Sequence, residues 1–144
     1  MIEQDTIKLL RECDAGVRMG ISSIDEVIDH VRDEKFRQRL TDCKNESDTL
    51  QNEIQSLLYE YHDDGKDPNP MAKGMSWVKT NVMLGVSESD KTIADLITDG
   101  CNMGVKSLHR YLNQYPAADE RSKNITNRLI SSEVRLANDI SQYL

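Results

Sequence analysis

Apolar residues recur every three or four positions along almost the whole chain, and this spacing constrains the fold more than any other feature. One such stripe lies between Ile7 and Val31, and a second lies between Phe36 and Tyr61. Positions at alternating steps of three and four share one face of an α-helix, whereas a half-buried strand alternates at every second residue. Because no segment shows that alternation, the pattern predicts an all-helical chain.

Turn and capping residues divide this chain into four long helices. Asp33 is placed to cap the second helix after a very short turn, so we expect the first two helices to be antiparallel neighbours. Ser87 and Ser89 offer caps for a third helix that runs from about Ser89 to Gln114, before Pro116 stops it. A fourth helix is expected from about Ala118 to the C-terminus.

The connection between the second and third predicted helices is long. Residues 62–69, with the sequence HDDGKDPN, break the helical pattern, and Asn69 followed by Pro70 then begins a short helix that we expect to end near Leu84. A connection of this length can run along a whole bundle, which would make the third helix parallel to the second. We therefore expect residues 1–144 to form a single four-helix-bundle domain with one long crossover that contains a short extra helix.

Composition disfavours several classes of partner. The net charge is −7, with 25 acidic against 18 basic residues, and the chain has one Trp and one Phe. A nucleic-acid-binding protein needs basic and stacking surfaces, and an acidic chain is repelled by anionic membranes. No apolar run is long enough to span a bilayer, and the N-terminus lacks the apolar centre of a signal peptide. The expectation is a cytoplasmic protein that binds neither nucleic acid nor membrane.

The three cysteines offer no evident catalytic site. Cys13, Cys43 and Cys101 fall on predicted core stripes, and their number is odd, without a Cys-x-x-Cys pair. We expect reduced structural thiols, because a cysteine nucleophile needs a nearby base and no histidine is evidently paired with one. The sequence shows no phosphate-binding glycine loop and no serine-nucleophile elbow. It therefore names no reaction.

Two pairs of glycines lie inside predicted helices. Gly16 and Gly20 are four residues apart on the first helix, as are Gly100 and Gly104 on the third. Since each glycine costs a helix up to about 1 kcal/mol relative to alanine, the pairs need an explanation. We favour close approach of the two helices, and the alternative is space kept open for a cavity or ligand.

Three segments carry a resemblance to a known superfamily: ECDAGVRMG in the first helix, NPMAKGMSWVKTNVML in the crossover and DKTIADLITDGCNMGVKSLHRYLNQY in the third helix. With them the chain resembles a small bacterial branch of the ferritin-like superfamily over nearly its whole length. The resemblance implies a four-helix bundle with one long crossover. Active members of the superfamily bind two iron or manganese ions, using one Glu from each of two helices and a Glu-x-x-His from each of the other two.

The metal ligands that this resemblance implies are incomplete here. Each predicted helix has one acidic candidate, namely Asp14, Glu46, Asp99 and Glu133. Thr49 and Leu136 stand where the Glu-x-x-His pattern requires histidine, and no histidine of the chain completes such a pair. For Asp14 and Glu133, which lie on apolar stripes, two interpretations stay open. Each is either satisfied by an internal hydrogen bond or salt bridge, or holds a metal or small polar ligand.

These observations favour a non-catalytic cytoplasmic bundle that acts through binding or through self-association as a homo-oligomer, with a degenerate metal centre and no cofactor. The alternative is a divergent di-metal carboxylate protein that uses the four acids to bind iron or manganese, in metal handling or oxidative-stress defence. A third class is a helical module that binds a protein partner through an exposed apolar patch.

Overall fold

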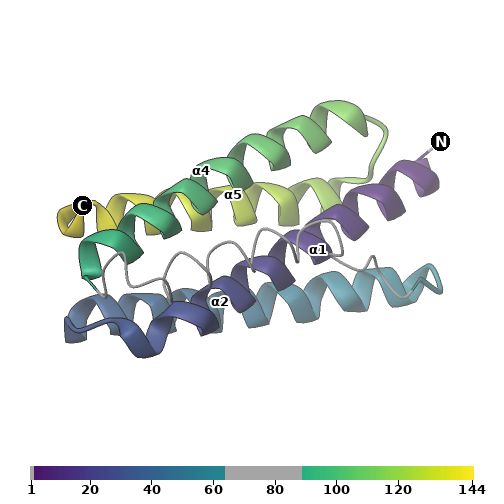
Figure 1. Cartoon of the computed structure of the whole chain (residues 1–144). Coiled ribbons are helices and arrows are strands. Elements are labelled where there is room, and N and C mark those ends of the chain that lie inside the picture. Colours follow the sequence, from purple (N-terminus) through teal and green to yellow (C-terminus); the bar gives the residue numbers. More distant parts are fainter. Residues whose placement is uncertain (1, 64–88) are drawn as a thin grey trace.

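The computed structural model describes residues 2–63 and 89–144, and every regular element in those two ranges is helical. Four long helices form a bundle (Figure 1), which confirms the prediction of an all-helical chain. They are α1 (Ile2–Val27), α2 (Glu34–Glu60), α4 (Asp90–Gln114) and α5 (Glu120–Ile140), and short 3₁₀ turns, η1 (Ile28–His30) and η2 (Ser141–Tyr143), follow α1 and α5. The predicted crossover helix between Pro70 and Leu84 lies outside the described residues.

Side-chain caps begin three of the helices. Asp33, Ser89 and Asp119 each accept a hydrogen bond from the backbone N–H three residues further on, at 2.9, 3.2 and 2.8 Å. Such a cap satisfies one of the backbone donors that a helix leaves unpaired at its N-terminus. The predicted starts at Asp33 and Ser89 are therefore confirmed.

The two helical hairpins, α1–α2 and α4–α5, have their turns at opposite ends of the bundle, and polar contacts show this. The Asp90 carboxylate, at the start of α4, accepts the backbone N–H groups of Arg32 and Asp33 at 2.8 and 2.9 Å. At the other end of the bundle, Thr6 near the start of α1 accepts the Asp119 N–H at 2.8 Å. As a result α2 and α4 begin at the same end and run in the same direction (Figure 1).

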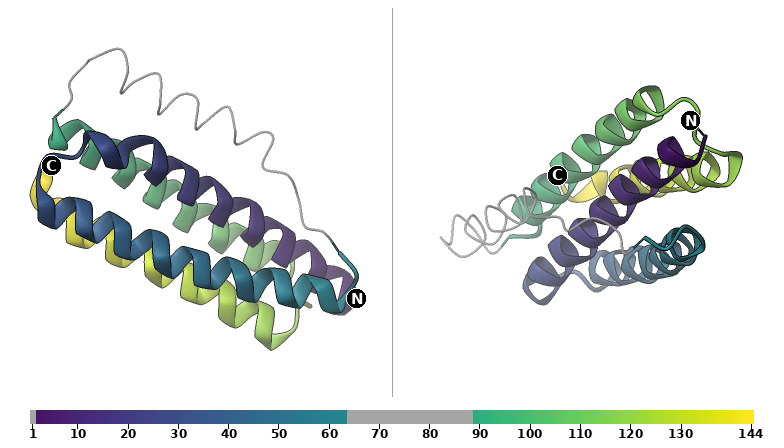
Figure 2. Two further views of the ribbon diagram at one scale, coloured as in Figure 1. Left: turned by 90° about the horizontal axis from the view of Figure 1, so that it is seen from below. Right: turned by 90° about the vertical axis from the view of Figure 1, so that its right-hand side faces the viewer.

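The helices form two layers, α1 with α2 and α4 with α5 (Figure 2). Helix α1 contacts mainly α2 and α4, and α5 contacts mainly α2 and α4, so the order around the bundle is α1, α2, α5, α4. Helix α1 also contacts α5 across the bundle. All four neighbouring pairs are antiparallel, and the parallel helices α2 and α4 lie at opposite corners. None of the described helices has both the length and the hydropathy that crossing a bilayer requires.

The apolar core is divided into two clusters, one toward each end of the bundle. The cluster beside the α1–α2 turn is built around Val27, Phe36, Leu40, Ile93, Ile97, Leu136 and Ile140. The other is built around Leu9, Leu10, Leu50, Ile54, Leu58, Leu108, Ile125 and Leu129. Between the clusters, the stripe position of each helix is taken by a small or polar residue, in order Gly20, Ser47, Gly104 and Glu133. The two clusters supply most of the hydrophobic stabilisation, whereas the layer between them is built from small and polar residues.

Charged side chains close the seam between α2 and α5. At steps of seven residues along α2, four of them form ion pairs with α5: Arg39 with Asp139 at 2.7 Å, Glu46 with Arg135 at 2.6 Å, Glu53 with Arg128 at 2.7 Å and Glu60 with Arg121 at 3.2 Å. Residues seven apart lie on nearly the same side of a helix. The pairs are largely exposed, so each contributes at most about 1 kcal/mol, but together they favour one register of the two helices.

Candidate functional site

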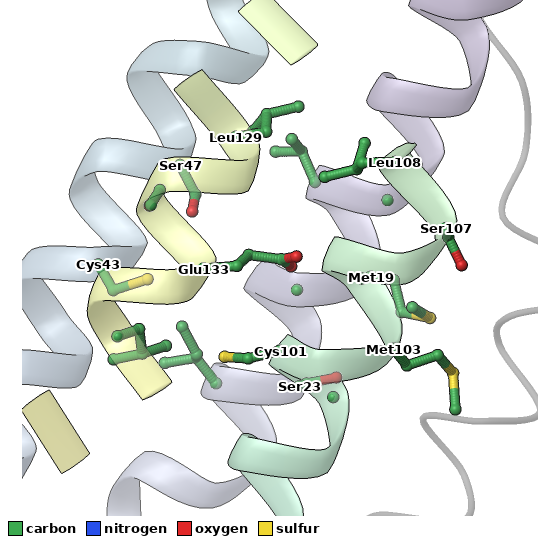
Figure 3. A pocket seen from close by; sticks show the side chains of 18 of the residues that line it. Met19, Ser23, Cys43, Ser47, Cys101, Met103, Ser107, Leu108, Leu129 and Glu133 are labelled. Atoms are coloured by element: carbon green, nitrogen blue, oxygen red, sulfur yellow. The ribbon is translucent and has the colours of Figure 1, made fainter. Parts of the chain in front are cut away.

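A cavity of about 130 Å³ lies between the two apolar clusters, and all four helices contribute to its wall (Figure 3). Apolar side chains such as Val17, Leu108 and Leu136 make up much of the lining. An engineered apolar cavity of about 150 Å³ is large enough to bind benzene. The space is therefore of the right size for one ring or a short branched chain.

Glycines leave the α1 and α4 side of this cavity open. A β-carbon added to Gly16, Gly20 or Gly100 would meet no atom within 4 Å outside its own helix backbone and chain neighbours, among the residues that the structure describes. All three line the cavity. Of the two interpretations of the glycine pairs, the described part of the chain favours open space over close packing at these positions.

Gly104 differs from the other three, because Glu133 lies against it. A β-carbon at residue 104 would stand 2.6 Å from the Glu133 Cδ and 2.5 Å from its Oε1. Real β-carbons do not approach other heavy atoms so closely, so the glycine provides the room that the carboxyl group occupies. Figure 3 shows the Glu133 side chain extending from α5 into the space between the helices.

Glu133 is the unusual ionisable group of the site. Its Oε2 is shielded from solvent and has no hydrogen-bond partner within the described ranges. Burial raises the pKa of Glu133 to about 8, since desolvation disfavours the charged form. At neutral pH the group is therefore mainly a carboxylic acid, which can both donate and accept a hydrogen bond. Of its two interpretations, this environment favours a polar ligand over an internal salt bridge.

The three cysteines are free, buried and part of the same wall. Burial raises the pKa values of Cys13 and Cys101 to about 12, and also raises the pKa of Cys43. The Cys13 Sγ lies 3.2 Å from the Thr126 Oγ1. The prediction of buried, unpaired thiols is confirmed, and their raised pKa values are the reverse of what a cysteine nucleophile needs.

The other acids predicted from the sequence lie elsewhere. Asp14 is fully buried in α1, and its Oδ2 lies 3.2 Å from the Arg18 Nη2, which agrees with the internal salt-bridge interpretation. Burial raises the pKa of Asp14, although Arg18 opposes the rise. Glu46 pairs with Arg135 at the α2–α5 seam, and Asp99 is exposed on α4.

Only Glu133 of the four predicted metal ligands reaches the cavity. Among the described residues, no three His, Cys, Asp or Glu side chains come close enough together to hold a metal ion. The structure thus does not bring Asp14, Glu46, Asp99 and Glu133 into one group, and metal binding by them stays a prediction.

Two lining residues have roles that the sequence analysis did not identify. Ser47 and Ser132 add hydroxyl groups to the wall, whereas the space beside Gly20 was one of the two interpretations of its glycine pair. A signal for Ser47 was present in the sequence, because it interrupts an otherwise apolar stripe. Recognising it requires the relative heights of the helices, which only the fold supplies.

Comparison of the chain with protein-family models, with curated proteins and with solved structures gave no match. A functional interpretation therefore depends on the chemistry of the cavity itself.

Proposed function

We propose that this protein is a non-catalytic binding protein that holds a small, mainly apolar molecule in its central cavity, against Glu133. The observation that carries the proposal is a cavity of about 130 Å³ into which one buried carboxyl reaches without a described partner. Ligand sites are typically concave and apolar, with a few polar groups that fix the orientation of the ligand. The cavity combines these properties on a small scale.

The stability of the bundle also favours a ligand. Unfilled cavity volume destabilises a protein by about 24 cal/mol per Å³, so a molecule that fills this space would contribute on the order of 3 kcal/mol in packing. The end clusters do not need rearrangement to admit it, because the space lies between them. Binding would therefore stabilise the folded protein.

Binding is a better explanation than catalysis for this set of side chains. The thiols of the wall are held protonated by burial. A covalent mechanism needs a nucleophile beside a base that activates it, and no described neighbour of Glu133 has that relationship to it.

The fold that we propose is ferritin-like. The parallel course of α2 and α4, and the long connection between them, support this assignment. The di-metal alternative is tested by elemental mass spectrometry after anaerobic reconstitution with Fe(II) and separately with Mn(II). Nearly two ions per chain, lost on Glu133→Ala, would favour that alternative over an apolar ligand.

The test of the proposed function is titration with toluene, followed by methyl NMR of the leucines that line the cavity. We expect saturable shifts at Leu129 and Leu136 in the wild type. Gly20→Leu places a side chain in the cavity and should abolish them, whereas Asn102→Leu, at an exposed position of α4, should not. Absence of saturable shifts in the wild type up to the solubility of toluene would overturn the proposal.

A further inference from the structure

Among the residues that the structure describes, the cavity wall contains acids but no bases. Glu12 and Glu133 both line it, and no Lys, Arg or His is found among the described residues of the lining. The whole chain carries a net charge of −7. The field of such a protein attracts cations and repels anions. The negative charge of the site and of the chain therefore disfavours anionic ligands.

Within the described ranges, Glu133 has no counter-charge that would let it ionise. The titratable groups that face it are the neutral thiols of Cys43 from α2 and Cys101 from α4, while Glu12 of α1 is engaged by the Tyr111 hydroxyl of α4. Arg39, whose charge acts on both thiols, is paired with Asp139. Without a positive partner, a buried carboxyl takes up a proton instead.

A ligand can supply the missing charge. An ammonium group carries a compact positive charge and three donors, which suits one carboxylate and the hydroxyl oxygens of Ser47 and Ser132 in the same wall. A guanidinium is wider and needs several acceptors in one plane. The apolar remainder of the cavity has room for about one ring.

We propose that the cavity binds a small primary amine, whose ammonium group pairs with the Glu133 carboxylate and whose apolar body of about one ring fills the remaining space. This inference rests on the proposed function, because it specifies the ligand of the same cavity. On binding, the Glu133 carboxyl releases its proton to solvent, the ammonium keeps its protons, and no other bond changes.

Proton release is the first readout. Calorimetric titration of the wild-type protein with benzylamine, in buffers of different ionisation enthalpy, measures the protons released for each ligand bound. With the pKa of Glu133 at about 8, release at pH 7 should be about 0.9 proton and should fall to about half a proton at pH 8. The dissociation constant for benzylamine should fall about tenfold between pH 6 and pH 7 and change little between pH 8 and pH 9, where the amine is still mostly an ammonium ion.

Ligands of matched shape provide the second readout. Toluene and benzyl alcohol have nearly the size of benzylamine without its charge, and benzoate carries the opposite charge. At pH 8.5 we expect benzylamine to bind at least about tenfold more tightly than benzyl alcohol, and benzoate not to bind. Glu133→Gln should remove proton release and abolish the preference for the amine, while Glu46→Gln, which changes an acid outside the cavity, should preserve both.

The outcomes separate this inference from the proposed function. Binding of toluene and benzyl alcohol with no preference for benzylamine would overturn the amine inference and leave the apolar cavity function standing. Binding of benzylamine without proton release at pH 7 would also overturn it, since Glu133 would not be the counter-ion. Absence of binding by all four compounds at millimolar concentration would overturn both. The wild-type measurement decides these outcomes even if Glu133→Gln folds poorly.

Discussion

The carboxyl group of Glu133 on α5 occupies the place that a β-carbon of residue 104 on α4 would take, because the Glu133 Cδ lies 2.6 Å from that position. Glycine at residue 104 costs helix α4 up to about 1 kcal/mol relative to alanine. The two side chains are therefore complementary in size, and the effect of changing one on the stability of the protein depends on the other.

This dependence predicts strong coupling between Gly104 and Glu133. Gly104→Ala should bring little gain in the wild type, because the new methyl group displaces the carboxyl. In a Glu133→Ala background the same change should stabilise the protein by about 1 kcal/mol, through helix propensity. Gly104→Leu should destabilise the wild type by more than about 1 kcal/mol by overpacking. Urea unfolding at pH 7 measures all of these, and additive effects of the first two changes would contradict the coupling.

Glu133 should also make stability depend on pH. Its pKa is about 8 in the folded protein and has an ordinary value of 4.5 in the unfolded chain, so between these values the folded state binds more protons. The free energy of unfolding should therefore fall as the pH rises from 5 to 8, by up to about 1.4 kcal/mol per pH unit. Glu133→Gln should remove this component and so be the more stable protein at pH 8.

The matching measurement is urea unfolding of both proteins at pH 5, 6.5 and 8. Because Asp14 is present in both, its own raised pKa cancels in the difference between them. Parallel stability profiles would place the Glu133 carboxyl in a solvated position.

The thiols should be unreactive in the native protein. Cys13 and Cys101 have pKa values of about 12 through burial, so almost no thiolate is present at pH 8. We expect a disulfide reagent such as DTNB to react at least about tenfold more slowly with native protein than with protein unfolded in urea, where all 3 cysteines should react. Rapid modification of Cys101 in the native state would show that its thiol is neither buried nor held protonated.

The ion pairs of the α2–α5 seam should contribute little individually. The bidentate pair between Arg128 and Glu53 lowers the pKa of Glu53, so its contribution is present above the ordinary pKa of a glutamate and is lost as the pH falls through the lowered value. Arg128→Ala should cost less than about 1 kcal/mol at pH 7, because both partners are substantially exposed.

Exchanging the charges of Glu53 and Arg128 tests whether the ion pair itself contributes to stability. Glu53→Arg and Arg128→Glu should each destabilise the protein, and the double variant should recover most of the loss at low salt. Failure of the double variant to recover would show that the pair does not stabilise the seam.

The sequence predicted the helices well because their stripes and caps are local signals. The caps at Asp33 and Ser89 each depend on a residue three positions further on, and the predicted helices begin there. The end of the first helix was less accurate. The apolar stripe continues to Val31, but α-helical geometry ends at Val27 and a 3₁₀ turn follows, since both forms bury residues at nearly the same spacing.

The site was predictable only in part, because helix rotation decides which acid faces inward. Neighbouring residues on a helix differ by about 100° in direction. Ser47 takes the inward position on α2, so Glu46 turns outward to Arg135. Glu133 was recognisable from the apolar residues on both sides of it in sequence. The partner of Asp14 was also visible, since Arg18 lies one turn further along the same helix.

Because the core is divided into two clusters, the residues that keep the bundle folded are largely different from those that determine which ligand it binds. The end clusters can keep the bundle folded while the middle layer varies, because that layer contributes little apolar burial. The space depends in part on one position of each helix, namely Gly20, Ser47, Gly104 and Glu133. Changes at these positions can therefore alter what the protein binds while the end clusters keep the scaffold folded, although Gly104 and Glu133 must change together.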